Sequence, residues 1–169
     1  MSLFTLKWVF ALDTNYSINA KAHLPRNFAA ACGFEDRAGR RRLEVHPDGT
    51  VTVVAPYAWD GCTPKFAICD IALGVPDGVP NLGTKKPKAY YASLLHDALY
   101  QFLDAGLPFD RAGADRIFLE ILARDGFAPR RFYYASVRIF GGVSRLLMRW
   151  KRSYRGRKVP MIGWVRPQS

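Results

Sequence analysis

The distribution of apolar and polar residues predicts strands in the first third of the chain. Two segments, 3–12 and 16–24, lie on either side of Asp13-Thr14-Asn15. Their residues are either continuously apolar or alternate between apolar and polar, which indicates two strands. A stronger signal follows at 42–54, where β-forming residues flank Pro47-Asp48-Gly49, a composition typical of a hairpin turn. The N-terminal third is therefore predicted to form a small antiparallel β-sheet.

Two segments lack a regular pattern and are predicted to be loops. A short one, 31–40, is rich in Gly and charge, and His46, just before the hairpin turn, is expected to be exposed. The long one, 55–87, contains five prolines and four glycines: Pro56, Pro64, Pro76, Pro80, Pro87, Gly61, Gly74, Gly78 and Gly83. Long ordered loops usually carry function, so we expect this one to line a site.

Helical periodicity begins after the long loop. Pro87 is expected to open a helix that runs to Ala105 and stops at Gly106. Its buried face would consist of Leu95, Leu99, Phe102 and Leu103.

A second helix is predicted over 111–125, with Asp110 as its N-cap and Gly126 at its end. Its apolar stripe consists of Ala114, Ile117, Phe118, Ile121 and Leu122. A third helix, aromatic and basic, would start at Pro129 and be interrupted at Gly141-Gly142.

Together these elements predict one α+β domain over 1–150. A sheet (1–56) would be followed by a loop (57–87) and a helical layer (88–150). Residues 151–169 are expected to form a basic C-terminal extension, irregular for most of its length. A chain of 169 residues is long enough for one such domain with its own core.

Composition indicates a folded protein without a membrane segment. Hydrophobic residues make up 49% of the chain and aromatic residues 14%, which is not typical of disorder. No apolar run approaches the roughly 20 residues of a membrane-spanning helix, and no secretory signal is recognised, so we expect a cytoplasmic protein. The three cysteines, Cys32, Cys62 and Cys69, lack metal-ligand spacing and are expected to be reduced.

Charge is concentrated at one end of the chain. The net charge is +11, and no acidic residue follows Asp125, whereas eleven Lys and Arg lie from Arg130 onward. An anionic lipid surface is the partner we expect, through Arg149, Trp150, Lys151, Arg152 and Trp164. Nucleic acid, phage structural proteins, or no dedicated partner at all fit the same composition.

The candidate chemistry lies on the first two predicted helices. His96 and Asp97 are adjacent, so they point about 100° apart on a helix, whereas Tyr100 lies one turn after His96 on the same face. Because the two helices are joined by a short connection, antiparallel packing can bring Asp115 near His96 and Tyr100. A carboxylate that fixes the tautomer of a histidine makes it a useful general base.

Plainer interpretations of the same residues stay open. A histidine in an apolar helix is commonly a buried residue whose hydrogen bonds are satisfied. An acidic residue at the margin of a core needs a partner, and Asp115 could form an ordinary salt bridge with Arg111 or Arg116.

Three stretches of the helical region resemble a known enzyme superfamily. They are Leu95-His96-Asp97-Ala98-Leu99-Tyr100-Gln101, Asp104-Ala105-Gly106-Leu107-Pro108 and Ala114-Asp115-Arg116-Ile117-Phe118. Together they resemble the catalytic helix pair of the phospholipase A2 superfamily, most closely the domain in parvovirus capsid proteins, over about residues 90–142. In addition, Asp60-Gly61-Cys62-Thr63-Pro64 and His96-Asp97-Ala98-Leu99-Tyr100 resemble a phage and bacterial family of unknown function.

The phospholipase resemblance implies a role for each matching residue. His96 would be the general base, oriented by Asp115 and Tyr100. Asp97 would be a calcium ligand, and calcium would polarise the ester carbonyl. The calcium loop would be 57–62, which includes Asp60 and Gly61, or else 73–78.

These residues predict a phospholipase A2-like lipid esterase, associated with a phage. One alternative is a non-catalytic virion or tail component, in which the helix pair is structural. Another is a nucleic-acid-binding accessory protein. The sequence leaves the oligomeric state open.

Overall fold

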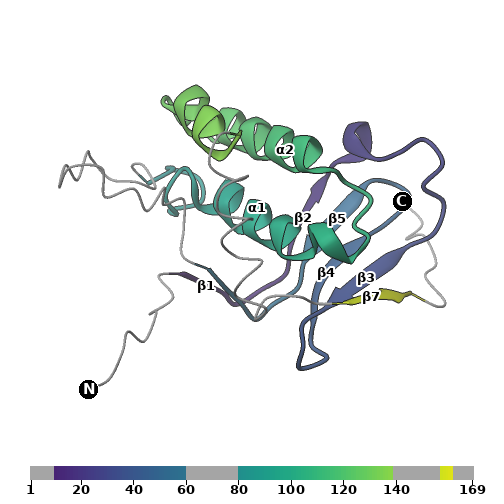
Figure 1. Ribbon diagram of the computed structural model, residues 1–169. Coiled ribbons are helices and arrows are strands. Elements are labelled where there is room, and N and C mark those ends of the chain that lie inside the picture. Colours follow the sequence, from purple (N-terminus) through teal and green to yellow (C-terminus); the bar gives the residue numbers. More distant parts are fainter. Residues whose placement is uncertain (1–9, 60–79, 139–156, 162–169) are drawn as a thin grey trace, which may run out of the picture.

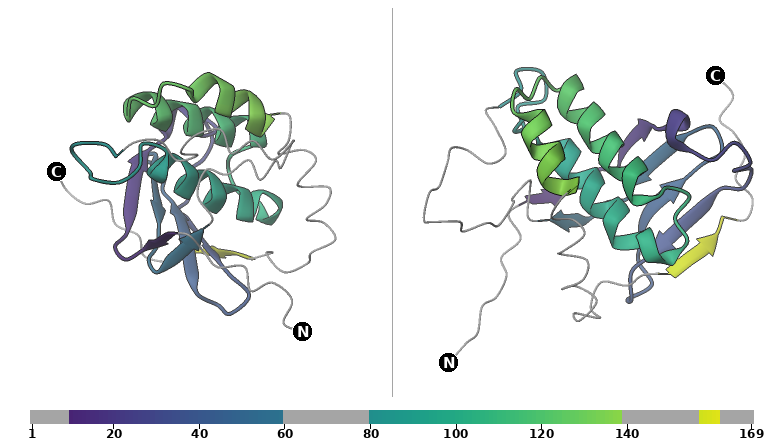
Figure 2. Two further views of the ribbon diagram at one scale, coloured as in Figure 1. Left: turned by 90° about the vertical axis from the view of Figure 1, so that its left-hand side faces the viewer. Right: turned by 45° about the horizontal axis from the view of Figure 1, so that its top comes forward.

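The computed structural model of the protein describes residues 10–59, 80–138 and 157–161. Two antiparallel sheets and a layer of helices make up these residues, and the helices lie over one face of the larger sheet (Figures 1 and 2). The predicted α+β class is confirmed.

The larger sheet has the strand order β2-β5-β4-β3-β7, with antiparallel neighbours throughout. Its strands are β2 (Tyr16–Asn19), β5 (Thr50–Val53), β4 (Arg41–Val45), β3 (Cys32–Glu35) and β7 (Arg157–Pro160). The predicted hairpin is confirmed as β4 and β5, in which Leu43 pairs with Val53 and Val45 with Val51. These four side chains are buried, whereas Arg42 and Glu44 are only partly buried, as alternation along a strand requires.

A smaller sheet joins β1 (Phe10–Leu12) to β6 (Tyr57–Trp59), with Phe10 opposite Trp59. Assigning residues 57–59 to a loop was therefore wrong. Tyr57 and Trp59 are buried, whereas Ala58 between them is exposed, which is the alternation of a half-buried strand. Three residues are too few for this alternation to be recognised in the sequence. The indole of Trp59 donates a hydrogen bond to Ser93 Oγ at 3.0 Å, which ties this sheet to the first helix.

Two further segments predicted to be irregular contain strands. β3 occupies 32–35 in the first part of the predicted 31–40 loop, and β7 lies in the predicted C-terminal extension. The two pair with each other, Cys32 opposite Pro160 and Glu35 opposite Arg157. Local composition could not reveal this pairing because the two strands are more than a hundred residues apart, although β3 also pairs with the nearby β4 on its other side.

The helices follow their predicted boundaries closely. α1 (Tyr90–Phe102) begins three residues after Pro87 and continues as a 3-10 turn (Leu103–Ala105), ending at Gly106 with φ +80°. In α2 (Arg111–Arg124), the N-cap side chain of Asp110 accepts a hydrogen bond from the amide of Gly113 at 2.6 Å. Residues 130–138 are helical, as predicted from Pro129 onward, and 139–150 lie outside the described residues.

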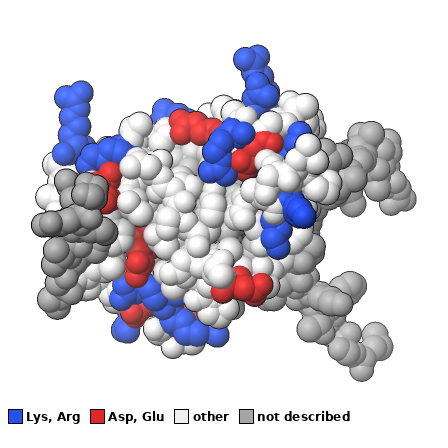
Figure 3. All heavy atoms as spheres, turned by 180° about the vertical axis from the view of Figure 1, so that it is seen from behind, with Lys and Arg blue, Asp and Glu red and all other residues white. Residues whose placement is uncertain are grey.

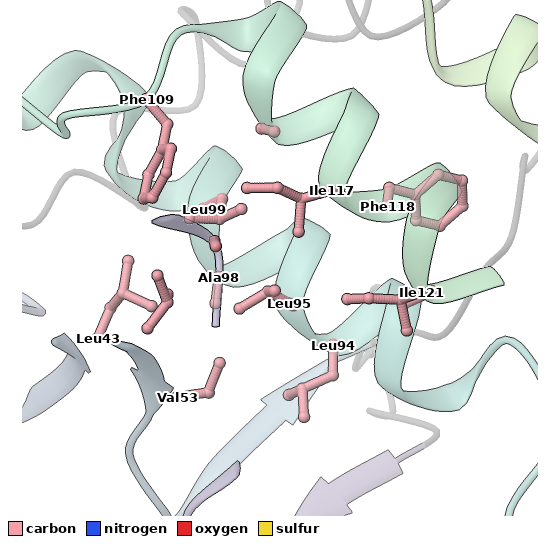
Figure 4. Packing of buried hydrophobic residues seen from close by; sticks show 14 of the residues in the cluster. Leu43, Val53, Leu94, Leu95, Ala98, Leu99, Phe109, Ile117, Phe118 and Ile121 are labelled. Carbon is pink, nitrogen blue, oxygen red and sulfur yellow. The ribbon is translucent and has the colours of Figure 1, made fainter. Parts of the chain in front are cut away.

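The core lies between the helices and the larger sheet (Figure 4). The view labels buried apolar side chains that converge from α1, α2, the sheet and the connection between the helices: Leu94, Leu95, Ala98, Leu99, Ile117, Phe118, Ile121, Leu43, Val53 and Phe109. Because α1 uses this face for the core, its other face is left to carry polar chemistry.

His46 is buried, so the expectation that it is exposed was wrong. The segment after β2 crosses the hairpin turn, where the amide of Ala20 donates to the carbonyl of Gly49 at 2.8 Å. A Cβ on Gly49 would lie 2.5 Å from Cβ of Lys21, and the φ of Gly49 is +98°, so glycine permits this close crossing. The covering segment is distant in sequence, which is why the turn looked exposed.

Candidate functional site

The packing of α1 against α2 brings three of the candidate residues together. The helices run antiparallel, so His96 and Tyr100 on α1 meet Asp115 near the start of α2. Nε2 of His96 lies 3.0 Å from Oδ1 of Asp115, and the hydroxyl of Tyr100 donates to the same oxygen at 2.5 Å. The proximity expected from sequence is therefore present, while the catalytic roles stay predictions.

Asp115 is the centre of this arrangement. Its side chain is 0% exposed, and its second oxygen, Oδ2, accepts a hydrogen bond from Nη1 of Arg138 at 3.1 Å. Burial by itself would raise the pKa of the Asp115 carboxyl. Hydrogen bonds from His96, Tyr100 and Arg138 outweigh burial and hold that pKa below its ordinary value. The carboxylate is consequently ionised at neutral pH despite its burial.

Aromatic rings flank the imidazole. The ring of Tyr100 lies 4.1 Å from that of His96, and the ring of Phe118 lies 4.9 Å from it, measured between centroids. Burial and the hydrogen bond to Asp115 both raise the pKa of the Tyr100 hydroxyl, which therefore stays a proton donor at all ordinary pH values. His96 is thus restricted on two sides by rings and on a third by the carboxylate.

One nitrogen of His96 is left for other chemistry. Since an ionised carboxylate only accepts hydrogen bonds, Nε2 carries the proton that Asp115 accepts, and the neutral ring keeps a lone pair on Nδ1. Nδ1 has no hydrogen-bond partner within residues 10–59, 80–138 and 157–161. The side chain of His96 is 11% exposed.

Arg111 connects the site to the third helical segment. Its Nε donates to the Tyr100 hydroxyl at 3.2 Å and lies 3.9 Å from Oδ2 of Asp115. Its Nη2 donates to the backbone carbonyls of Val137, at 3.0 Å, and Arg138. The salt bridge that sequence allowed with Arg111 is present beside the His96 contact.

The sequence reasoning missed Arg138. Nothing local pointed to it, because Arg138 lies 23 residues after Asp115 in a segment where arginine is common. The other salt-bridge candidate, Arg116, is exposed and makes no ion pair with Asp115.

The predicted metal ligands are not brought together within the described residues. Asp97 is partly buried on α1, whereas Asp60 and Gly61 lie outside the described residues. Among the residues that the structure describes, no group of three His, Cys, Asp or Glu could hold a metal ion. Calcium usually takes about six to eight oxygen ligands, so Asp97 without the segment around Asp60 does not make a calcium site.

The predicted lipid-binding residues, Arg149, Trp150, Lys151, Arg152 and Trp164, also lie outside the described residues. On the face shown in Figure 3, basic and acidic side chains lie close to one another, and uncharged residues occupy much of the space between. That face therefore carries charge of both signs. Within the described ranges, no helix has the length and apolar character needed to cross a membrane.

A second histidine also contacts a carboxylate. Nε2 of His23, in the 3-10 turn Lys21–His23, lies 2.9 and 3.0 Å from the two oxygens of Glu120 on α2. No neighbouring residue in the sequence indicates this contact, because the partner of His23 is 97 residues away. The side chain of Glu120 is 65% exposed, so this pair sits at the surface.

Comparisons of the chain with models of known families, with curated proteins and with solved structures give no match. The chemistry of the site is therefore inferred from its geometry.

Proposed function

We propose that this protein is a hydrolase of the phospholipase A2 type, in which His96 activates a water molecule for attack on a carboxylic ester of a lipid. One observation carries the proposal: Nε2 of His96 is bound to the fully buried carboxylate of Asp115, while Nδ1 has no partner among the described residues. The pair of His96 and Asp115 is called the dyad from here on.

The dyad is suited to moving one proton. A water molecule hydrogen-bonded to Nδ1 gives up a proton to that nitrogen while its oxygen attacks the ester carbonyl carbon. The imidazolium that forms is stabilised by the charge of Asp115, 3.0 Å away on the opposite side of the ring. The proton then passes from Nδ1 to the alcohol oxygen as the carbon–oxygen bond breaks, giving a carboxylic acid and an alcohol.

Tyr100 would keep this geometry in place. Its hydroxyl donates a hydrogen bond to Oδ1 of Asp115, the oxygen that His96 also contacts, and its ring packs against the imidazole. An imidazole that can rotate freely would often adopt orientations in which Nδ1 does not face the water molecule. Tyr100 is therefore proposed as a positioning residue, and it does not touch the reacting atoms.

Calcium is kept as part of the proposal on chemical grounds. Asp97 would supply one carboxylate, and Asp60 and the backbone of Gly61 would supply further oxygens, which are the ligands that calcium prefers. A bound calcium ion would polarise the ester carbonyl and stabilise the oxyanion. The association with a phage and the two non-enzymatic alternatives stay predictions.

The test is release of fatty acid from phosphatidylglycerol vesicles, measured with calcium and with a chelator. We expect release by the wild type and a loss of about 100-fold to 10,000-fold in His96→Asn, because the general base is gone. His23→Asn is the matched control, since it removes a different histidine that contacts a carboxylate, and it should retain full activity. A folded wild type that releases no fatty acid under either condition would refute the proposal. Equal release with calcium and with the chelator would show that calcium is not part of the mechanism.

A further inference from the structure

The larger sheet ends in two edge strands, β2 and β7, which differ in what they expose (Figure 1). An edge strand leaves backbone amides and carbonyls unpaired, and proteins commonly block such edges with proline, with charge or with a covering segment. Within the described residues, neither strand pairs with another strand on its outer side. The groups on each outer side therefore decide whether a further strand can be added there.

The edge of β7 is blocked by its own residues. The amide of Met161, just after β7, donates to the carbonyl of Ala31. Because hydrogen bonding alternates along an antiparallel pair, Val159 also faces β3, whereas the backbone of Lys158 and Pro160 faces outward. Proline has no amide hydrogen, and the exposed Lys158 places a charge at the edge. Only one of the two outward-facing residues can therefore donate to an added strand.

The edge of β2 has no such block. The amide of Ala20, just after β2, donates to the carbonyl of Gly49 at 2.8 Å. By the same alternation Ile18 faces β5, whereas the backbone of Ser17 and Asn19 faces outward. Both outward-facing residues are exposed and uncharged, and each has an amide and a carbonyl to offer. This edge is therefore open to an added strand.

A second copy of β2 fits this edge when the two strands run antiparallel and each Ser17 lies opposite its equivalent. Ser17 faces outward in both copies, so the two serines exchange backbone hydrogen bonds. In this register Tyr16 of each copy lies opposite Ile18 of the other. Both side chains pack against the core and are only partly buried. An aromatic ring opposite a β-branched side chain is a favourable cross-strand pair.

The charges that flank β2 match in the same register. Asp13 precedes the strand and Lys21 follows it, and both residues are exposed. Each is four positions from Ser17, so Asp13 of one copy faces Lys21 of the other. The ammonium group of Lys21 is held beside the carbonyl of Pro47 in the hairpin turn. An antiparallel pair thus brings opposite charges together at both ends, whereas a parallel pair would bring like charges together.

We propose that β2 is a self-association surface, through which two copies of the protein pair edge to edge and join their larger sheets. This inference goes beyond the proposed function and does not depend on it. The contact is isologous, with the two-fold axis between the two Ser17 residues. Strand addition gains its affinity from main-chain hydrogen bonds, so removing one outward-facing amide should disrupt it.

The test is the oligomeric state of the full chain, measured by sedimentation velocity over a range of protein concentrations. We expect a dimer for the wild type and a dissociation constant about tenfold or more higher for Ser17→Pro, which removes the outward amide and none that faces β5. Ser17→Ala loses only the hydroxyl that contacts Thr52 and should dimerise like the wild type. Lys158→Pro, the matched control at the other edge, should also dimerise. A wild type that is monomeric throughout would overturn the inference, as would unchanged dimerisation of Ser17→Pro.

A second measurement locates the contact in the wild type, without any variant that has to fold. Amide hydrogen exchange is followed by NMR at high and low protein concentration. We expect the amides of Ser17 and Asn19 to exchange more slowly in the dimer, whereas the amide of Lys158 should be unaffected by concentration. Equal exchange of Ser17 and Asn19 at both concentrations would show that the copies do not meet at β2.

A charge exchange tests the register. Asp13→Lys and Lys21→Asp should each raise the dissociation constant about twofold to tenfold at low ionic strength, because like charges then meet at both ends. An equimolar mixture of the two variants restores opposite charges at both ends, so it should dimerise as tightly as the wild type. A mixture no tighter than either variant alone would contradict the antiparallel pairing of β2.

Discussion

Two of the histidine–carboxylate pairs among the described residues lie at nearly the same distance, but the surroundings of their carboxylates differ. His96 lies 3.0 Å from Asp115, and His23 lies 2.9 Å from Glu120. The two imidazole side chains are equally exposed, yet the carboxylate of Asp115 is fully buried and that of Glu120 is largely in water. Contact distance therefore does not distinguish a candidate catalytic pair from a surface pair, whereas the environment of the carboxylate does.

The physical difference lies in what each carboxylate requires. Glu120 can be hydrated when His23 moves away, so its contact is dispensable. Asp115 has no water to replace its partners, and its charge is acceptable only because His96, Tyr100 and Arg138 all donate to it. The buried pair is consequently locked in one geometry, which is the property that a general base needs.

The largest expected effect is on stability when the two carboxylates are removed in turn. Asp115→Ala should lower the free energy of unfolding by about 3–5 kcal/mol, because buried donors lose their acceptor. Glu120→Ala should cost less than about 1 kcal/mol. Urea unfolding followed by circular dichroism measures both values, with Asp115→Asn as a milder variant if the alanine protein does not fold. Similar losses at the two positions would show that burial is not what separates the pairs.

A smaller effect is expected from removing one donor to the buried carboxylate. Tyr100→Phe deletes the hydroxyl that donates to Asp115 and should cost about 1.5–3 kcal/mol, as hydrogen bonds to charged groups do. Tyr91→Phe is the control, because the Tyr91 hydroxyl has no hydrogen bond within the described residues although its ring stacks on Tyr16. Equal unfolding midpoints for Tyr100→Phe and the wild type in urea would contradict the role given to this hydroxyl.

The smallest effect concerns pH. The pKa of Asp115 is lowered on folding, so its ionised form adds stability above its unfolded pKa of about 3.9, and this contribution is lost as pH falls through the folded pKa. The difference in unfolding free energy between wild type and Asp115→Asn should therefore be constant above about pH 5 and shrink below pH 4. Guanidinium unfolding at a series of pH values measures this difference in unfolding free energy. A difference that grows as the pH falls would contradict a lowered pKa for Asp115.

The sequence was most informative where structure is decided locally. The Asp110 cap, the Gly106 stop and the Pro47-Asp48-Gly49 turn each depend on a few adjacent residues, and all three are found in place. The approach of His96 to Asp115 was also foreseeable, because a short connection leaves two amphipathic helices few ways to pack. Here a nonlocal contact was predicted through local rules.

The sequence was uninformative where distant segments meet. β3 and β7 pair only after the chain has returned across the domain, and Ala20, more than twenty residues before His46, lies against the turn that follows His46. Glu120 and Arg138 look like any other charged residues on helices until the tertiary structure gives each a partner.

By itself, then, the sequence determined the helices and their caps, the hairpin, and the face on which His96, Tyr100 and Asp115 lie, since these follow from backbone propensities and apolar periodicity. Only the tertiary structure decided which carboxylate is buried and how many donors reach it, and only it placed Arg138 beside the dyad. Such contacts form only when the whole chain packs, because the free energy that holds each one comes from groups scattered along the sequence.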